Sequence, residues 1–137
     1  MLNEGDTYTD VVIFQQEDVE AFARITGDYN PVHFSDHDKT DGMSGRAVVH
    51  GMLAASAFGK VLGMVFPGKE SVVLYREITF VRPVFVGLLY TMNFKITGID
   101  HANSEGVIKS SLKNEKGQIC IHILSRIRNT RAFSFHQ

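Results

Sequence analysis

The stretch that decides the fold is GMLAASAFGKVLGMV, residues 51–65. Built as a helix, it carries apolar side chains in nearly every direction, and Lys60 is its one charged residue. A helix that is apolar all round is buried on all sides. At 1.5 Å per residue it would be about 22 Å long, which suits the centre of a small domain. We therefore predict a buried central helix over residues 51–65.

After residue 71 the apolar residues change to a period of two. This alternation runs through residues 77–82, 90–97 and 119–124, and it is typical of strands. Residues 114–117, Asn-Glu-Lys-Gly, predict a hairpin turn between a strand over 107–113 and the last strand. Short connections between consecutive strands indicate an antiparallel sheet. We expect an α+β fold in which a curved antiparallel sheet wraps around the central helix.

The chain before the central helix predicts smaller elements. Residues 8–14 are rich in Val, Ile and Thr and predict a first strand. Residues 17–26 have apolar side chains at helical spacing, and Gly27 ends this helix as a left-handed cap. Pro31 keeps the residue before it out of helical geometry, so residues 28–31 form a loop. The polar stretch 35–46 predicts a short helix plus a loop.

Composition narrows the class of protein. A chain of 137 residues, 44% of them apolar, has the size and core of one domain spanning residues 1–137. A net charge of −1 argues against a dedicated nucleic-acid binder. A single cysteine, Cys120, rules out an internal disulfide framework and fits a reducing compartment. The first residues lack a secretory pattern, and residues 47–67 are too interrupted for a membrane span, so we expect a cytoplasmic protein without membrane contact.

Asp28, Asn30 and His33 lie within six residues, in a loop bounded by Gly27 and containing Pro31. A carboxylate and an imidazole at that spacing can converge on one water and share a proton as acid and base. The structural alternative is that Asp28 and Asn30 form the turn and that His33 fills a surface.

His50, Gly51 and Met52 lead into the central helix. The first N–H groups of a helix are free and carry about half a positive charge, and Gly51 has no side chain to obstruct its own. A carbonyl oxygen that gains negative charge would be stabilised there. Alternatively, Gly51 permits close packing and His50 is a buried histidine with satisfied hydrogen bonds.

Three further groups of residues favour structural roles. His33 and His37, with Asp36, Asp38 and Asp41 nearby, lack a third strong donor at defined spacing, so we expect no metal. Cys120 lies in an isoleucine-rich strand, where a lone thiol packs as a small apolar side chain. The basic side chains near the C-terminus suit either a phosphate or a solvated edge strand; they are Arg126, Arg128 and Arg131.

Two segments together carry a family resemblance. They are GDYNPVH, residues 27–33, and GRAVVHGML, residues 45–53, and the likeness continues through residues 67–68 and ITFVRPVFVG, residues 78–87. In this order the chain resembles the MaoC-like hydratases, and in particular the short (R)-specific enoyl-CoA hydratases. The resemblance implies a hot-dog fold, in which an antiparallel sheet wraps a long helix. It also implies a homodimer with active sites near the subunit interface.

The resemblance also implies roles for individual residues. Asp28 and His33 would hold the catalytic water, and the Gly51 N–H would bind the thioester oxygen. Asn30 would support the loop. It is assigned to substrate binding together with His50 and Met52, the residues on either side of Gly51. The substrate would be an acyl-CoA or acyl-carrier-protein thioester, with no cofactor and no metal. The implied reaction is reversible hydration of a trans-2-enoyl thioester to the (R)-3-hydroxyacyl thioester, a hydro-lyase reaction of fatty-acid metabolism.

Two residues depart from the family pattern, and two other functions stay open. Ala47 stands where the family usually has proline, and Leu88 stands where it often has an acidic residue. Hot-dog domains also include acyl-CoA thioesterases, which usually need an acid on the central helix, and residues 51–65 hold no Asp or Glu. A non-catalytic acyl-binding subunit is the other alternative. Four residues are candidates for shaping the acyl pocket: Met43, Val65, Phe66 and Tyr75.

Overall fold

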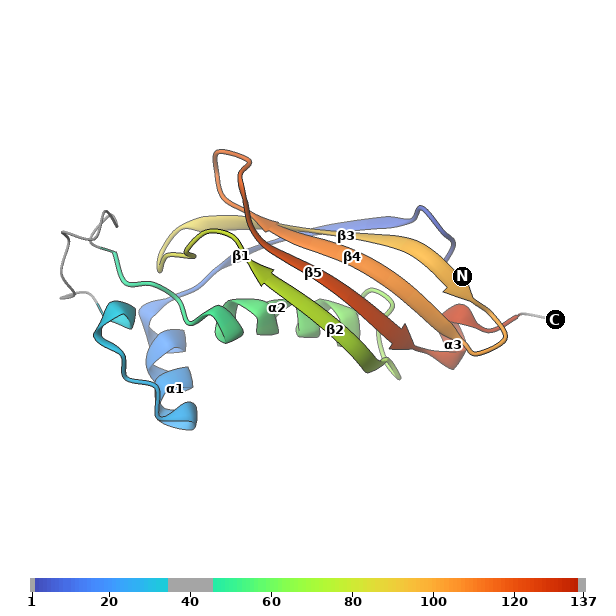
Figure 1. Ribbon diagram of the computed structural model, residues 1–137, viewed down its shortest axis with the longest axis horizontal. Coiled ribbons are helices and arrows are strands. Elements are labelled where there is room, and N and C mark those ends of the chain that lie inside the picture. Colours follow the sequence, from blue (N-terminus) through green and yellow to red (C-terminus); the bar gives the residue numbers. More distant parts are fainter. Residues whose placement is uncertain (1, 35–45, 136–137) are drawn as a thin grey trace.

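The computed structural model describes residues 2–34 and 46–135, and it places one antiparallel sheet over a long helix (Figure 1). The elements are β1 (Thr7–Ile13), α1 (Gln16–Thr26), the 3-10 helix η1 (Pro31–His33), α2 (Gly51–Met64), β2 (Val72–Phe80), β3 (Leu89–Asp100), β4 (Glu105–Lys113), β5 (Ile119–Arg128) and α3 (Thr130–Phe133). The predicted α+β fold is confirmed. Residues 35–45, which hold most of the predicted short helix and loop, lie outside the described residues.

The sheet has the order β1-β3-β4-β5-β2, and every neighbouring pair is antiparallel. The hairpin turn between β4 and β5 is confirmed: the Asn114 side chain accepts hydrogen bonds from the amides of Lys116 and Gln118, and Gly117 has a φ of +77°. β2 precedes β3 in the chain but pairs with β5, at the opposite edge from β1. β2 is therefore an edge strand of the sheet.

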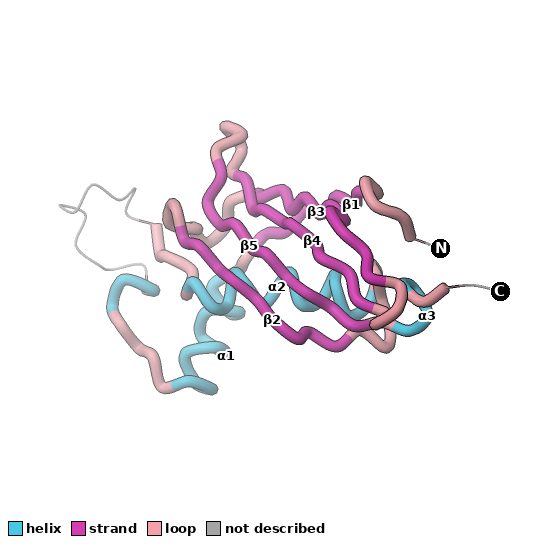
Figure 2. Tube along the Cα trace, turned by 45° about the vertical axis from the view of Figure 1, so that its right-hand side comes forward, coloured by secondary structure: helices cyan, strands magenta, loops and turns pink. Residues whose placement is uncertain are grey.

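One face of the sheet packs against α2, as Figures 1 and 2 show. Alternate residues of β3, β4 and β5 are buried on that face, so the predicted period of two is confirmed there. The buried contacts of this core include Phe94, Ile96, Ile108, Leu112, Ile121, Ile123 and Ile127 from the sheet and Ala54, Ala55, Phe58, Val61 and Leu62 from α2. Burial of these apolar side chains holds α2 against the sheet.

The prediction that the central helix is buried on all sides is wrong for one of its faces. Met52 is 57% exposed and Met64 is 61% exposed, and Ser56 and Lys60 between them are exposed as well. The sheet covers α2 from one side, and its edge strand β2 runs beside the helix (Figures 1 and 2). An apolar helix sequence indicates that the helix is central, but it does not show which face of the helix is left uncovered by other elements.

Capping residues fix where two of the helices end or begin. α1 ends at Gly27, whose φ of +79° and hydrogen bond to the Ala23 carbonyl at 2.7 Å confirm the predicted left-handed cap. α3 was not predicted, and it begins where the Asn129 side chain accepts hydrogen bonds from the amides of Arg131 and Ala132. Within the described residues, no helix has the length and apolar character needed to cross a membrane.

Candidate active site

Asp28 is positioned by the turn that ends α1. Its backbone N–H donates to the Thr26 hydroxyl at 3.2 Å, and its Oδ1 accepts from the Asn30 N–H at 3.2 Å. This Asx-type turn occupies one carboxylate oxygen and leaves Oδ2 available. The side chain is 52% exposed, so Oδ2 is open to solvent and to a ligand.

His33 is positioned by η1 and by the segment before α2. The Asn30 side chain accepts from the Val32 N–H at 3.2 Å and starts η1, whose last residue is His33. The His33 ring is buried, and its Nδ1 lies 2.7 Å from the Val48 carbonyl. A carbonyl oxygen accepts hydrogen bonds and cannot donate them, so Nδ1 carries the proton. In the neutral ring Nε2 therefore has a free lone pair.

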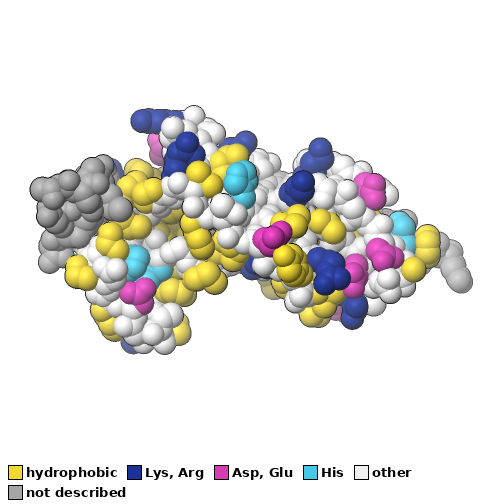
Figure 3. All heavy atoms as spheres, in the orientation of Figure 1, with side chains coloured by type: hydrophobic (Ala, Val, Ile, Leu, Met, Phe, Trp, Pro, Cys, Tyr) yellow, Lys and Arg dark blue, Asp and Glu magenta, His cyan; other side chains and the backbone are white. Residues whose placement is uncertain are grey.

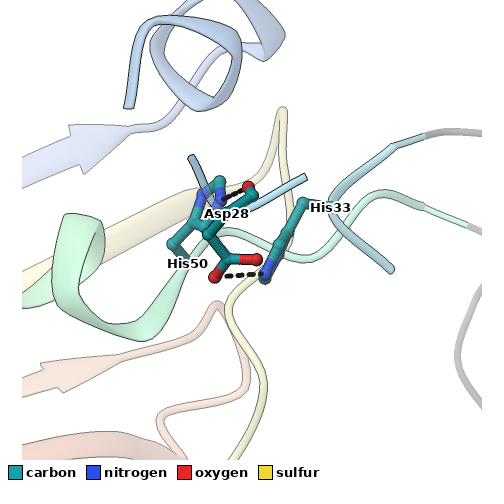
Figure 4. Close-up of side chains that lie close together, drawn as sticks. All are labelled: Asp28, His33 and His50. Carbon is teal, nitrogen blue, oxygen red and sulfur yellow. Dashed lines mark hydrogen bonds and ion pairs between the residues drawn. The ribbon is translucent and has the colours of Figure 1, made fainter. Parts of the chain in front are cut away.

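The free atoms of these two side chains face each other. Asp28 Oδ2 lies 3.7 Å from His33 Nε2, which is longer than a hydrogen bond (Figure 4). With a neutral ring, both atoms are acceptors, and a water molecule beside them can donate one O–H to each. Such a water would keep its oxygen lone pairs for a third atom. The sequence-based expectation that this carboxylate and this imidazole converge agrees with the geometry.

His50 lies behind the pair. It is almost fully buried, its Nε2 lies 3.0 Å from the Asp28 backbone carbonyl, and its ring stacks on His33 at a centroid distance of 3.7 Å. Phe22 of α1 contacts its ring at a centroid distance of 4.9 Å. His50 thus links the Asp28 loop, the His33 ring and the start of α2. These contacts place it as a support for the pair, and its Nδ1 has no hydrogen-bond partner among the described residues.

Gly51 is the first residue of α2, so its N–H has no acceptor within the helix. A Cβ at this position would lie 2.8 Å from the Phe80 ring of β2, so glycine at residue 51 leaves room for the ring to approach this closely. Two hollows of about 360 and 440 Å³ meet at this point, and His33, Gly51 and Phe80 line both. Asp28, His50 and Met52 line the second hollow. The structure therefore leaves room between the Asp28–His33 pair and the amino end of α2.

Figure 3 shows the same region at the surface, where histidine and acidic side chains meet beside apolar ones. The apolar lining comes from Phe22, Met52 and Phe80 in one hollow and from Val48, Val49, Val81, Pro83, Val84 and Ile121 in the other. A largely apolar hollow with a few polar groups at one point suits a small-molecule ligand. A bound ligand that excludes water from the hollow would strengthen a hydrogen bond to a developing negative charge there.

Asp28, His33 and His50 are the one group among the described residues with the spacing of a metal site. Oxygen or nitrogen atoms of Asp28, His33 and His50 lie within 4.8 Å of one another. Each imidazole already has one ring nitrogen at a backbone carbonyl, at 2.7 and 3.0 Å. The other candidate ligands, around His37, lie outside the described residues.

The remaining candidates have structural partners. Glu105 pairs with Arg126 at 3.5 Å and with Arg128 at 2.9 Å, and Arg131 lies 3.7 Å from Glu70. Cys120 is buried, and burial raises the pKa of its thiol, which disfavours the reactive thiolate. Of the candidates for the acyl pocket, Val65, Phe66 and Tyr75 line neither hollow, and Met43 lies outside the described residues.

Sequence reasoning missed two contributors to the site. Val48 orients His33 through its backbone carbonyl, and a backbone group leaves no trace in the residue type. Phe80 reaches the site from β2, 29 residues after Gly51, through the folding of the edge strand over α2. Its place in the motif that continues the family resemblance was the signal that could have identified it.

Comparisons with known proteins agree with this fold. A sequence profile of the MaoC like domain matches residues 3–116. The (R)-specific enoyl-CoA hydratase of Aeromonas caviae is 32% identical over 108 residues, which are 79% of this chain and 81% of that protein. The mitochondrial 3-hydroxyacyl-[acyl-carrier-protein] dehydratase of Arabidopsis thaliana is 32% identical over 87 residues, which are 64% of this chain and 51% of that protein. The chain therefore spans about half the length of the plant relative.

A solved structure shares the fold over most of the chain. The (R)-hydratase from A. caviae involved in PHA biosynthesis superposes with a TM-score of 0.84 and 29% sequence identity. The match covers 93% of this chain and 96% of that chain. The hot-dog arrangement expected from the sequence is thereby confirmed.

Proposed function

This chain belongs to the MaoC-like domain family, and we propose that it adds water to a trans-2-enoyl thioester to give the (R)-3-hydroxyacyl thioester, and catalyses the reverse dehydration. The observation that carries the proposal is the 3.7 Å approach of Asp28 Oδ2 to His33 Nε2, beside the free amide end of α2. The A. caviae relative is named for this reaction.

The first step places the substrate. The thioester carbonyl oxygen accepts a hydrogen bond from the Gly51 N–H, where the helix end favours negative charge. The acyl chain lies in the apolar hollows, with Met52 and Phe80 against it. C3 of the enoyl group then lies beside the water that the Asp28–His33 pair holds.

The second step moves one water onto the double bond. As the water oxygen forms its bond to C3, one water proton passes to the Asp28–His33 pair. The π electrons move towards the thioester carbonyl, and the charge on its oxygen is stabilised at Gly51, where one donor contributes about 3 kcal/mol. The pair then gives the proton to C2, so one H and one OH are added and the protein returns to its starting state. Acid–base assistance of this kind supplies about 10²–10⁴-fold in rate.

The site also bears on stereochemistry. Because one pair of side chains both activates the water and returns the proton, the H and the OH are added to the same face of the double bond. The hollow holds the enoyl group by its carbonyl at one end, so one face is turned to Asp28 and His33. We assign the (R) configuration of the product on the likeness to the A. caviae enzyme.

We propose a homodimer formed through the edge of the sheet. β2 exposes large apolar side chains at this edge, among them Val72, Val73 and Tyr75. An exposed apolar edge strand favours pairing with a second strand. The site lies next to this edge, because Phe80 of β2 contacts Gly51. Sedimentation of the purified chain tests the dimer, and a monomer at micromolar concentration would exclude it.

Two other activities use a similar fold. Thioester hydrolysis would need water at the carbonyl carbon and an acid on the central helix, and α2 contains neither Asp nor Glu. An acyl-carrier-protein substrate remains open to test, because the plant relative is named a 3-hydroxyacyl-[acyl-carrier-protein] dehydratase. Its dehydration would use the same side chains in reverse.

The proposed function is tested by following the absorbance of enoyl-CoA thioesters of increasing chain length with the purified chain. We expect loss of the enoyl absorbance, no release of free thiol, and a 3-hydroxy product of (R) configuration. Release of free thiol would identify a thioesterase. Binding without turnover would identify a non-catalytic acyl-binding protein.

A further inference from the structure

A polar hollow of about 480 Å³ lies on the face of the sheet that points away from α2. The sheet order places β1, β3, β4 and β5 side by side there (Figure 2). Along β3 and β4 the side chains of this outer face alternate with the buried side chains of the core. Asp28, His33 and Gly51 do not line this hollow, so it is separate from the candidate active site.

Four neutral polar side chains form a row across the hollow. The strand register pairs Thr9 with Asn93 and Asn93 with Ser111. Ser111 is paired in turn with His122 of β5. Neighbouring strands lie about 4.8 Å apart, so the row is about 14 Å long. The Thr9 hydroxyl donates to Asn93 Oδ1 at 3.4 Å, and this is the one hydrogen bond that these four side chains make to other described residues. The Asn93 amide and the Ser111 hydroxyl therefore have free donors.

Three lysines flank this row and line the same hollow. Lys95 and Lys109 are paired in register on one side of it, and Lys113 lies on the other side. In β4, Lys109 and Lys113 are each two residues from Ser111, which is about 7 Å along the strand. A lysine side chain is long and flexible enough to bring its ammonium group over that distance. Three positive charges can therefore meet over Ser111.

These lysines have no carboxylate partner in the part of the chain that the structure describes. Like charges directly opposite each other in a sheet, such as Lys95 and Lys109, are destabilising. Among residues 2–34 and 46–135, no Asp or Glu lines the hollow or forms an ion pair with any of the three lysines. Farther along the same face, Glu105 lies 3.5 Å from Arg126 and 2.9 Å from Arg128. The hollow thus has unpaired positive charge together with free hydrogen-bond donors.

We propose that this hollow binds a phosphate group, carried either by a small free anion or by the coenzyme A part of a thioester. The phosphate oxygens accept charge-assisted hydrogen bonds from Lys95, Lys109 and Lys113, and further hydrogen bonds from Asn93 and Ser111. A phosphate has more charge and more acceptor oxygens than a carboxylate, which suits three cations with several neutral donors. Bound between Lys95 and Lys109, it replaces their mutual repulsion by two attractions. The site does not depend on the hydratase function.

The test is a titration of the purified full chain with inorganic pyrophosphate, followed by NMR. We expect the resonances of Asn93, Ser111 and His122 to shift, and the Kd to rise with added NaCl because salt screens the lysines. Lys109→Gln should raise the Kd by about tenfold, since it removes one charge-assisted contact. This variant should fold with a melting temperature no lower than that of the wild type at low salt, because it also removes the repulsion from Lys95.

Lys69→Gln is the matched control, because it removes the same charge from an exposed residue that does not line the hollow. It should bind pyrophosphate as the wild-type chain does. An absence of shifts at the lining residues would overturn the assignment. Equal weakening by Lys69→Gln and Lys109→Gln would also overturn it, because the attraction would then come from the overall charge and not from this hollow.

Kinetics with crotonyl-CoA distinguish the two sources of the phosphate. If coenzyme A carries it, pyrophosphate should compete with crotonyl-CoA, and Lys109→Gln should raise KM with kcat unchanged. If a separate small anion carries it, Lys109→Gln should weaken pyrophosphate binding and leave KM unchanged. A chain that binds pyrophosphate in the hollow and hydrates no enoyl thioester would refute the hydratase function and support the phosphate site.

Discussion

Asp28 and His33 present one free polar atom each to the same point, at a separation of 3.7 Å, while the other polar atom of each side chain is bound to the backbone. Asp28 Oδ1 accepts from the Asn30 N–H, and His33 Nδ1 donates to the Val48 carbonyl. The backbone therefore decides which atoms are left to hold a water.

The first prediction concerns the tautomer of His33. Because Nδ1 lies 2.7 Å from a carbonyl oxygen, the neutral ring should carry its proton on Nδ1 and leave Nε2 free. Nitrogen-15 NMR of the imidazole side chains distinguishes the two neutral tautomers. His50 serves as the internal comparison, because its Nε2 faces the Asp28 carbonyl and should carry the proton. A proton on Nε2 of neutral His33 would remove the acceptor that the mechanism needs.

Much of this arrangement could be predicted from the sequence, for physical reasons that are local. Gly27 and Pro31 fix the loop that holds Asp28, and the alternation in residues 90–97 and 119–124 follows from one buried face of the sheet. The central helix was recognisable because its apolar residues cover nearly every direction.

The features that could not be predicted depend on contacts between distant segments. β2 pairs with β5 and not with its sequence neighbour β3, and this pairing brings Phe80 to Gly51. One side of α2 is exposed, at Met52 and Met64, which the apolar sequence of the helix does not indicate. The bond from His50 to the Asp28 carbonyl involves the backbone, so it has no counterpart in residue types.

A second prediction separates the amide of Gly51 from the space beside it. Gly51→Ala keeps the N–H, but its Cβ would lie 2.8 Å from the Phe80 ring. The displaced ring should narrow the hollow and lower kcat/KM for crotonyl-CoA by about ten- to hundredfold. Phe80→Ala in the same chain should restore part of the loss. Gly98→Ala in β3, where a Cβ meets no atom within 4 Å, is the control and should have wild-type activity. Full activity of Gly51→Ala would show that the Phe80 contact does not shape the site.

A third prediction concerns metal removal. The proposed reaction uses a carboxylate, an imidazole and a backbone amide, so dialysis against EDTA should leave kcat unchanged. Asp28, His33 and His50 have ligand atoms within 4.8 Å of one another, so the alternative is a metal ion bound by these three side chains. Activity that is lost with EDTA and restored by Zn²⁺ would identify these three residues as metal ligands and would rule out the metal-free acid–base mechanism.

The most direct test is whether Asp28 and His33 act as one unit on a single water. The measurement is kcat for crotonyl-CoA hydration by Asp28→Asn, His33→Gln and the double variant, with melting temperatures to confirm that each chain folds. We expect each single substitution to lower kcat by about 10²–10⁴-fold, and the double variant to lose little more than either, because residues that act together are non-additive. Near-wild-type turnover by either single variant, or losses that multiply in the double variant, would contradict the account.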